Sequence, residues 1–255
     1  ASWTTLISGY ATHGQGAEAM RMFERMRYEG CCPNEITFIS VLKACGSIGA
    51  LVKGQEIHAK MREQGLLKNS IVVGNAVIDM YAKCGALQRA CEVFDELPQR
   101  DVVSWTALIT GYANHGLGCQ AVQIFRQMED EGISPNAWTY VCILNACAAI
   151  GSFDIGETIH GKLREQGLLK DNIVLGNALI DMYTKCGVLQ KAQEVFDELP
   201  QRDIVSWNVL IAGYVEHGLG DQAIKCFRQM DDEGIISDDI TYTCILNACA
   251  AIISL

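Results

Sequence analysis

The chain has 255 residues, of which 49% are hydrophobic and 20% are charged, and no apolar run approaches the ~20 residues that span a membrane. This composition is that of an ordinary globular protein and excludes a disordered chain. The net charge of −10 argues against non-specific nucleic-acid binding, which depends on phosphate neutralisation, but permits a protein that reads unpaired bases along one local groove.

A period of 102 residues organises the chain, because Trp3, Trp105 and Trp207 recur at that spacing within nearly the same frame. Three related units of 35, 36 and 31 residues fit within one period. In chain order the predicted units are 1–34, 35–70, 71–101, 102–136, 137–172, 173–203, 204–238 and the incomplete 239–255. We therefore expect a single repeat array that forms part of a longer protein.

Each unit predicts two helices. In the unit 102–136, Ser104 is expected to be the N-cap of the first helix, and "NHGLG" at 114–118 separates it from the second. Gly132 and Pro135 are expected to end the second helix. The apolar face of that second helix follows helical spacing through Ala121, Val122, Phe125 and Met128.

A helical hairpin of this size cannot bury both of its faces alone, whereas stacked neighbours can. The expected fold is therefore all-α, a right-handed α-solenoid of stacked helix-turn-helix repeats. Its inner surface would expose the first-helix residues that do not pack. Thr106 is one of them, and the equivalent residues after the other two repeated tryptophans are Thr4 and Asn208. The frame around this position is kept while the polar residue varies.

The cysteines and histidines favour structure over chemistry. Most of the twelve cysteines recur with the repeat, so we expect buried thiols in a reducing compartment. No Cys/His cluster has ligand spacing, and therefore no metal site and no cofactor is predicted. Neither an H-x-E with a downstream C-x-x-C, nor a P-loop, nor a nucleophile elbow occurs. The chain is not expected to be an enzyme.

Three motif types in fixed order resemble pentatricopeptide repeats, specifically the plant PLS subclass of RNA-editing-factor type. "VVSWTALITGYANHG" resembles the P motif, "TYVCILNACAAIGSFDIGETIHGKL" the L motif and "GNALIDMYTKCG" the S motif. The array then reads P (1–34), L (35–70), S (71–101), P (102–136), L (137–172), S (173–203), P (204–238) and partial L (239–255). The alternative, a tetratricopeptide repeat at ~34 residues per unit, fits poorly because one unit has only 31 residues.

The resemblance implies sequence-specific binding of single-stranded RNA, one nucleotide per unit, with the RNA running 5′ to 3′ along the chain. Two residues per unit carry the code in this family, one in the first helix and one at the end of the unit. The corresponding reading pairs are Thr4 with Asn34, Asn75 with Asp101, Thr106 with Asn136, Asn177 with Asp203, and Asn208 with Asp238. A Thr–Asn pair resembles an adenine reader and an Asn–Asp pair a uracil reader, giving the target 5′-A-n-U-A-n-U-U-3′. The alternative, that these residues merely cap helices, does not explain their pairing.

The middle units depart from this pattern. Weak reading or none is expected at Ile39, Val141 and Thr243 in the first helices, and at Ser70 and Asn172 at the unit ends. In the family the L motifs also dock small accessory editing-factor proteins, which implies such a partner here. A protein-interaction scaffold with little RNA binding of its own is the alternative function.

Valines at the helix entrance have a proposed role too. The resemblance implies that Val72, Val103, Val174 and Val205 wedge between successive bases, and the alternative is packing between units. Family members of this type mostly direct C-to-U RNA editing in mitochondria or chloroplasts, through a deaminase domain beyond the last repeat. The implied role is therefore to find the RNA without altering it. No membrane association is expected.

Overall fold

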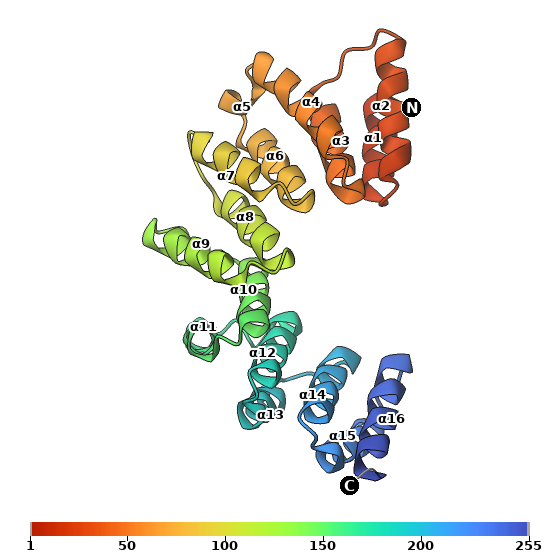
Figure 1. Ribbon diagram of the computed structural model, residues 1–255, viewed down its shortest axis with the longest axis vertical. Helices are drawn as coiled ribbons and strands as arrows, with labels where there is room; N and C mark the ends of the chain where they lie inside the picture. Colours follow the sequence, from red (N-terminus) through yellow and green to blue (C-terminus); the bar gives the residue numbers. More distant parts are fainter. Residues whose placement is uncertain (1, 254–255) are drawn as a thin grey trace. The chain divides into compact units, whose positions relative to one another are not determined.

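The computed structural model describes residues 2–253, and every element within that range is an α-helix (Figure 1). The first and last predicted units extend to residues 1 and 254–255, which lie outside the described part. No helix in the described residues is long and apolar enough to cross a membrane. The chain divides into two compact units between Pro135 and Asn136.

The first compact unit contains four hairpins and one short extra helix. Its elements are α1 (Trp3–Thr12), α2 (Gly16–Tyr28), α3 (Glu35–Ile48), α4 (Leu51–Glu63), α5 (Leu66–Asn69), α6 (Ile71–Lys83), α7 (Leu87–Glu96), α8 (Val102–Asn114) and α9 (Gly118–Asp130). The first helix of each hairpin packs on the first helix of the next, in the order α1, α3, α6 and α8. Figure 1 shows α3 between α1 and α6.

The second compact unit repeats this arrangement. Its elements are α10 (Ala137–Ile150), α11 (Phe153–Glu165), α12 (Ile173–Lys185), α13 (Leu189–Glu198), α14 (Ile204–Glu216), α15 (Gly220–Asp232) and α16 (Asp239–Ile253). First helices again pack in a row, in the order α10, α12, α14 and α16. The predicted all-α fold of stacked helical hairpins is confirmed.

Two of the three repeated tryptophans, Trp105 and Trp207, belong to the core, and Trp3 is half-buried. Trp105 is fully buried, and its ring meets the edge of Phe94 from the preceding hairpin at 4.6 Å between ring centroids. Trp207 and Phe196 repeat this contact at the same 4.6 Å. Aromatic pairs in this edge-to-face geometry contribute roughly 0.5–1.5 kcal/mol beyond the burial of their area. The invariant frame of the repeat therefore serves packing.

Tight turns within the hairpins depend on glycine. Between α8 and α9, Gly116 adopts a φ of 73°, and the Leu117 amide donates back to the Tyr112 carbonyl at 3.0 Å. A side chain at Gly116 would be strained in this left-handed conformation, which is the usual end of a helix. The predicted break at 114–118 is present.

Two local features differ from the sequence expectation. The loop after α4 contains one additional helical turn, α5, which follows Gly65 in a left-handed conformation with a φ of 69°. Ser104 is not the N-cap of α8, because Asp101 takes that place and Ser104 lies three positions further on. The two side chains form a reciprocal capping box, so the better acceptor begins the helix and the hydroxyl supports it.

Candidate nucleic-acid interface

Each predicted unit ends on the residue that caps the first helix of the following hairpin. At α8, the Asp101 carboxylate accepts a hydrogen bond from the Ser104 backbone amide at 2.9 Å, and the Asp101 amide donates to the Ser104 hydroxyl at 3.1 Å. The same side-chain acceptor occurs at Asn34, Asn136, Asn172, Asp203 and Asp238, whereas Ser70 precedes α6 without a side-chain cap bond. The capping interpretation is thus correct for the last residue of these units.

Capping does not account for the other half of each pair. Asn75 donates from Nδ2 to Oδ1 of Asp101 at 3.1 Å, although it lies inside α6 and caps nothing. Two further Asn–Asp pairs have the same bond, Asn177 with Asp203 at 3.2 Å and Asn208 with Asp238 at 3.0 Å. The structure therefore brings together all three predicted Asn–Asp pairs, at the entrances of α8, α14 and α16.

The Thr–Asn pairs have a different geometry. Thr4 shares a hydrogen bond with the Thr37 hydroxyl at 2.9 Å, and that hydroxyl donates to Oδ1 of Asn34 at 2.8 Å. Thr37 thus links the two members of the first pair. Thr106 and Asn136 fall in different compact units; the Thr106 hydroxyl donates to the Val102 carbonyl at 2.6 Å, and Asn136 caps α10.

Four of the five first-helix members of the pairs are nearly buried, and the fifth, Thr4, is half-buried. Thr106 is 7% exposed, Asn75 and Asn208 are 8% exposed, and Asn177 is 9% exposed. Nearly buried side chains of this kind have few rotamers available, and each of the three asparagines directs its Nδ2 to a carboxylate. A ligand that reaches this edge would meet a defined hydrogen-bonding pattern.

Local hydrogen bonding keeps the paired carboxylates ionised. Burial alone would raise the pKa of Asp203, but hydrogen bonds from the backbone and hydroxyl of Ser206 and from Asn177 outweigh it, and the pKa lies below its usual value. Asp101 has the same balance of causes and a lowered pKa. For Asp238, the hydrogen bond from the Thr241 backbone amide is the largest cause of a lowered pKa. Each Asn–Asp pair therefore carries one negative charge at neutral pH.

The described residues of the middle units form no such pair. Ile39 is half-buried and Val141 is 8% exposed, and neither side chain can form a hydrogen bond. Thr243 is exposed, and its hydroxyl donates to the Asp239 carbonyl at 2.7 Å. At the unit ends, Ser70 donates to the Glu35 carboxylate at 2.7 Å, and Asn172 accepts from the Leu175 amide at 3.2 Å.

A row of exposed apolar residues lies one helical turn before the reading position. Val72, Val103, Val174 and Val205 are each 49–56% exposed, so they do not serve mainly as packing between units. Residues three apart share one face of a helix, which places each valine beside the reading residue of its own helix. Sequence reasoning missed the members of this row that are not valine, namely Ile36, Trp138 and Ile240, which are 58–60% exposed. Their register, two places after the last residue of the preceding unit, is the signal that identifies them.

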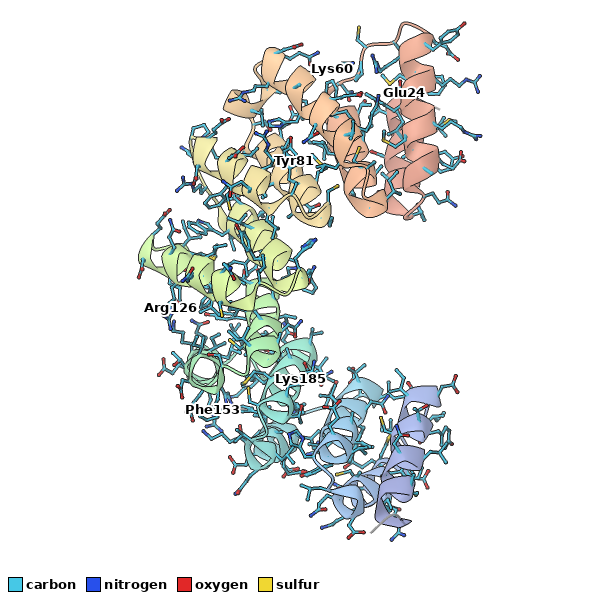
Figure 2. All side chains as sticks on the ribbon, in the orientation of Figure 1. Glu24, Lys60, Tyr81, Arg126, Phe153 and Lys185 are labelled. Carbon is cyan, nitrogen blue, oxygen red and sulfur yellow. The ribbon has the colours of Figure 1, made fainter. Side chains whose placement is uncertain are left out.

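In each short unit, the first helix ends with a lysine. Lys83 and Lys185 lie eight positions after Asn75 and Asn177, and Lys185 is labelled on α12 in Figure 2. Each forms an ion pair one turn back, Lys83 with Asp79 at 2.7 Å and Lys185 with Asp181 at 2.8 Å. Both lysine side chains are 49% exposed. Exposed ion pairs of this kind contribute little to stability, so these cations remain available to an anionic ligand.

The cysteines are only partly as expected. Cys45, Cys142 and Cys147 are buried, and burial raises the pKa of the Cys45 thiol to about 12. Cys31, Cys32 and Cys119 are exposed, although we expected the cysteines to be buried. These three do not occupy repeated positions. The described residues contain no group of three or more His, Cys, Asp or Glu side chains that could hold a metal ion.

The sequence matches one known family. The model of the PPR repeat family matches residues 1–47, 100–149 and 202–251, and that of the PPR repeat matches 75–102 and 177–204. A chloroplastic pentatricopeptide repeat-containing protein of Arabidopsis thaliana is 39% identical over 98% of this chain, and a mitochondrial one is 40% identical over the same share. The chain spans about two fifths of the length of each relative, 40% in both cases.

A solved structure supports the fold independently of sequence. The crystal structure of the pentatricopeptide repeat protein PPR10 in complex with an 18-nt psaJ RNA element matches with a TM-score of 0.60 and 21% identity. The match covers 96% of this chain and 42% of that chain. PPR10 from maize without RNA matches with a TM-score of 0.62.

Proposed function

This chain belongs to the pentatricopeptide repeat family, and we propose that it binds single-stranded RNA sequence-specifically, one nucleotide per unit. The observation that carries this proposal is the hydrogen bond between the two members of each Asn–Asp pair, such as Asn75 with Asp101 at 3.1 Å. This bond fixes the position of a donor and an acceptor at each of the three units that would read uracil. The RNA complex of the structurally similar PPR10 supports the same class of ligand.

Base selection follows from the size and polarity of the first-helix residue. The short side chain of Thr106 leaves room for a purine, whereas Asn177 fills that room and suits a pyrimidine. The paired Asp203 offers only acceptors while it is ionised. Five read units then give the target 5′-A-n-U-A-n-U-U-3′, in which n faces a middle unit.

The neighbouring residues would hold the rest of the nucleotide. The exposed row that includes Val103 and Trp138 would separate or stack successive bases, which is sequence-tolerant because every base has a flat face. Lys83 and Lys185 would exchange their carboxylate partners for phosphates. This local supply of cations would let a chain with a net charge of −10 bind RNA.

Competition binding tests the proposal. The chain should retain a labelled 5′-ACUACUU-3′ RNA in the presence of excess duplex RNA or of DNA with the same sequence. Selection from random RNA should return adenine at the first and fourth places and uracil at the third, sixth and seventh. Recovery of random sequence at all five places would contradict the reading pairs.

A role as the recognition module of a C-to-U editing factor in a chloroplast or mitochondrion is part of the same proposal. It is supported by the P, L and S motif order and by relatives that are chloroplastic or mitochondrial. A small accessory editing-factor protein would dock on the middle units 35–70 and 137–172. By setting the spacing between units it would lower the ordering cost of RNA binding. Equal RNA affinity with and without such a protein would contradict this part.

The second candidate is a protein-interaction scaffold. It is favoured by the acidic charge and by the apolar Ile39 and Val141 where a base would otherwise be read. The two functions separate in one experiment, because a scaffold would bind the accessory protein but would not discriminate RNA from DNA.

A further inference from the structure

The three reading asparagines share one hydrogen bond and differ in a second. The amide oxygen Oδ1 of Asn208 accepts a hydrogen bond from the Thr241 hydroxyl at 2.6 Å. The corresponding oxygens of Asn75 and Asn177 are buried and have no hydrogen-bond partner among the described residues. Only Asn208 is therefore held at both ends of its amide, by Asp238 on the nitrogen and by Thr241 on the oxygen.

The difference does not come from the cap itself. Thr241 Oγ1 lies 2.9 Å from Oδ1 of Asp238 and 3.2 Å from its backbone nitrogen. Ser206 Oγ occupies the equivalent place at α14, 3.0 Å from Oδ1 of Asp203 and 3.2 Å from its backbone nitrogen. The two hydroxyls are placed alike on their own helices, and only the one on α16 reaches the asparagine of the preceding hairpin. What differs is the contact with the preceding hairpin, which Thr241 makes and Ser206 does not.

Thr37 supports this interpretation from the other compact unit. Thr37 comes just after a long unit, 1–34, as Thr241 does after 204–238. Its hydroxyl lies 2.9 Å from the hydroxyl of Thr4, the first-helix member of the pair in that unit. Ser104 follows a short unit, and its hydroxyl bonds only with Asp101. A hydroxyl three places after the helix cap thus contacts the preceding first-helix residue at Thr37 and Thr241, which follow long units, and not at Ser104 and Ser206, which follow short ones.

An amide group held at one end can rotate about its Cβ–Cγ bond and exchange its donor for its acceptor, since the two ends have nearly the same shape. Rotation of Asn177 would break one hydrogen bond, and rotation of Asn208 would break two. The orientation that directs the Asn208 nitrogen to Asp238 is therefore the more strongly fixed.

We propose that Thr241 is a positioning residue of the RNA-reading site, which fixes the amide of Asn208 and so sets the base preference of the unit 204–238. The inference rests on the proposed function, in which that unit reads the seventh base. Ser206 makes no equivalent contribution to the sixth base, because its hydroxyl does not reach Asn177.

The test compares two hydroxyl deletions. Thr241→Val and Ser206→Ala each remove a capping-box hydroxyl that contacts the paired Asp, and only the first also removes a bond to the reading asparagine. Binding is measured to 5′-ACUACUU-3′ and to versions with adenine at the sixth or the seventh place. Thr241→Val should lower the preference for uracil at the seventh place by about threefold to tenfold and leave the sixth place unchanged. Ser206→Ala should leave the sixth-place preference within about twofold.

Thr241→Ser keeps the hydroxyl and should preserve the seventh-place preference. An unchanged preference in Thr241→Val, or an equal loss at the sixth place in Ser206→Ala, would overturn the inference while leaving the proposed function intact. A wild-type chain that does not bind the RNA would reject both. Should Thr241→Val not fold, side-chain NH2 order parameters in the unsubstituted chain decide: a higher value for Asn208 than for Asn177 supports the inference, and equal values refute it.

Discussion

Asn177 and Asp203, 26 positions apart and on different helical hairpins, are joined by a hydrogen bond from Nδ2 to Oδ1 of 3.2 Å. Asp203 also begins the helix α14, since its carboxylate accepts from the Ser206 amide at 2.9 Å. One carboxylate thus connects the entrance of one helix to the reading position of the preceding one. The last residue of a unit thus caps one helix and binds the paired asparagine of the preceding helix at the same time, as the proposed base reading requires.

A double-mutant cycle measures this connection. Asn177→Ala and Asp203→Ala should each destabilise the chain, and the double variant should be more stable than the sum predicts by about 1 kcal/mol, because either change alone removes the same bond. The measurement is urea unfolding followed by circular dichroism. Asn75→Ala combined with Asp203→Ala is the matched control, since these residues belong to different pairs, and its effects should add. Additivity in the Asn177–Asp203 cycle would show that the bond contributes nothing.

The paired carboxylates also predict a pH dependence. The pKa of Asp203 is lowered from its ordinary 3.8, so its contribution to the free energy of unfolding is complete above that value and is lost as pH falls through the lower folded pKa. The Asp203→Asn variant lacks the charge. Its deficit in unfolding free energy relative to the wild type should be constant from pH 7 to about pH 5 and shrink below about pH 4. An equal deficit at pH 7 and pH 3 would contradict the lowered pKa.

Trp138 should contribute affinity without selectivity. It is 58% exposed in the register of the valines that are proposed to wedge between bases, and it precedes Val141, which cannot hydrogen-bond a base. Trp138→Ala should weaken RNA binding by roughly 1–3 kcal/mol, as loss of base stacking does, while every base preference stays unchanged. Trp138→Phe should retain most of the affinity. A similar loss from Trp138→Phe and Trp138→Ala would indicate that stacking is not the contribution of this residue.

Lys83 and Lys185 should each contribute to the salt dependence of RNA binding. Lys83→Ala and Lys185→Ala should each reduce the slope of log affinity against log salt by about 0.7, the value for one phosphate contact on a single strand. The paired Asp79 and Asp181 provide opposite controls, because their replacement by alanine frees the cation and should strengthen binding. Unchanged slopes in both lysine variants would exclude these phosphate contacts. Fluorescence anisotropy across a salt series makes the measurement.

Periodicity in the sequence was sufficient to predict the stacked hairpins, because residues such as Trp105 and Phe94 recur where a buried contact must recur. The helix entrance was predicted less well. Both Asp101 and Ser104 are good capping residues, and only the observed reciprocal bonds decide which of them begins the helix. Trp138 was not predicted because the valines were recognised by residue type, and Trp138 shares only their position relative to the end of the preceding unit.

The contacts between hairpins could not be derived from the sequence. Ser206 and Thr241 stand at equivalent positions and carry the same hydroxyl, yet only Thr241 reaches the preceding asparagine. That outcome depends on how consecutive hairpins pack against each other, which equivalent hydroxyls alone do not determine. The pairing of Asn75 with Asp101 came from family resemblance, and their 3.1 Å bond is a property of the fold.

The most direct test of the account transfers one pair of reading residues onto another unit. Thr106→Asn together with Asn136→Asp gives the unit 102–136 the pair that occurs at Asn208 and Asp238, in a frame that already tolerates both residues. Circular dichroism should show an unchanged fold. RNA selection should return uracil instead of adenine at the fourth place, with the other read places unchanged. Thr106→Asn alone should weaken the preference for adenine without a full gain for uracil. A folded double variant that still prefers adenine at the fourth place would contradict the two-residue reading of RNA by this protein.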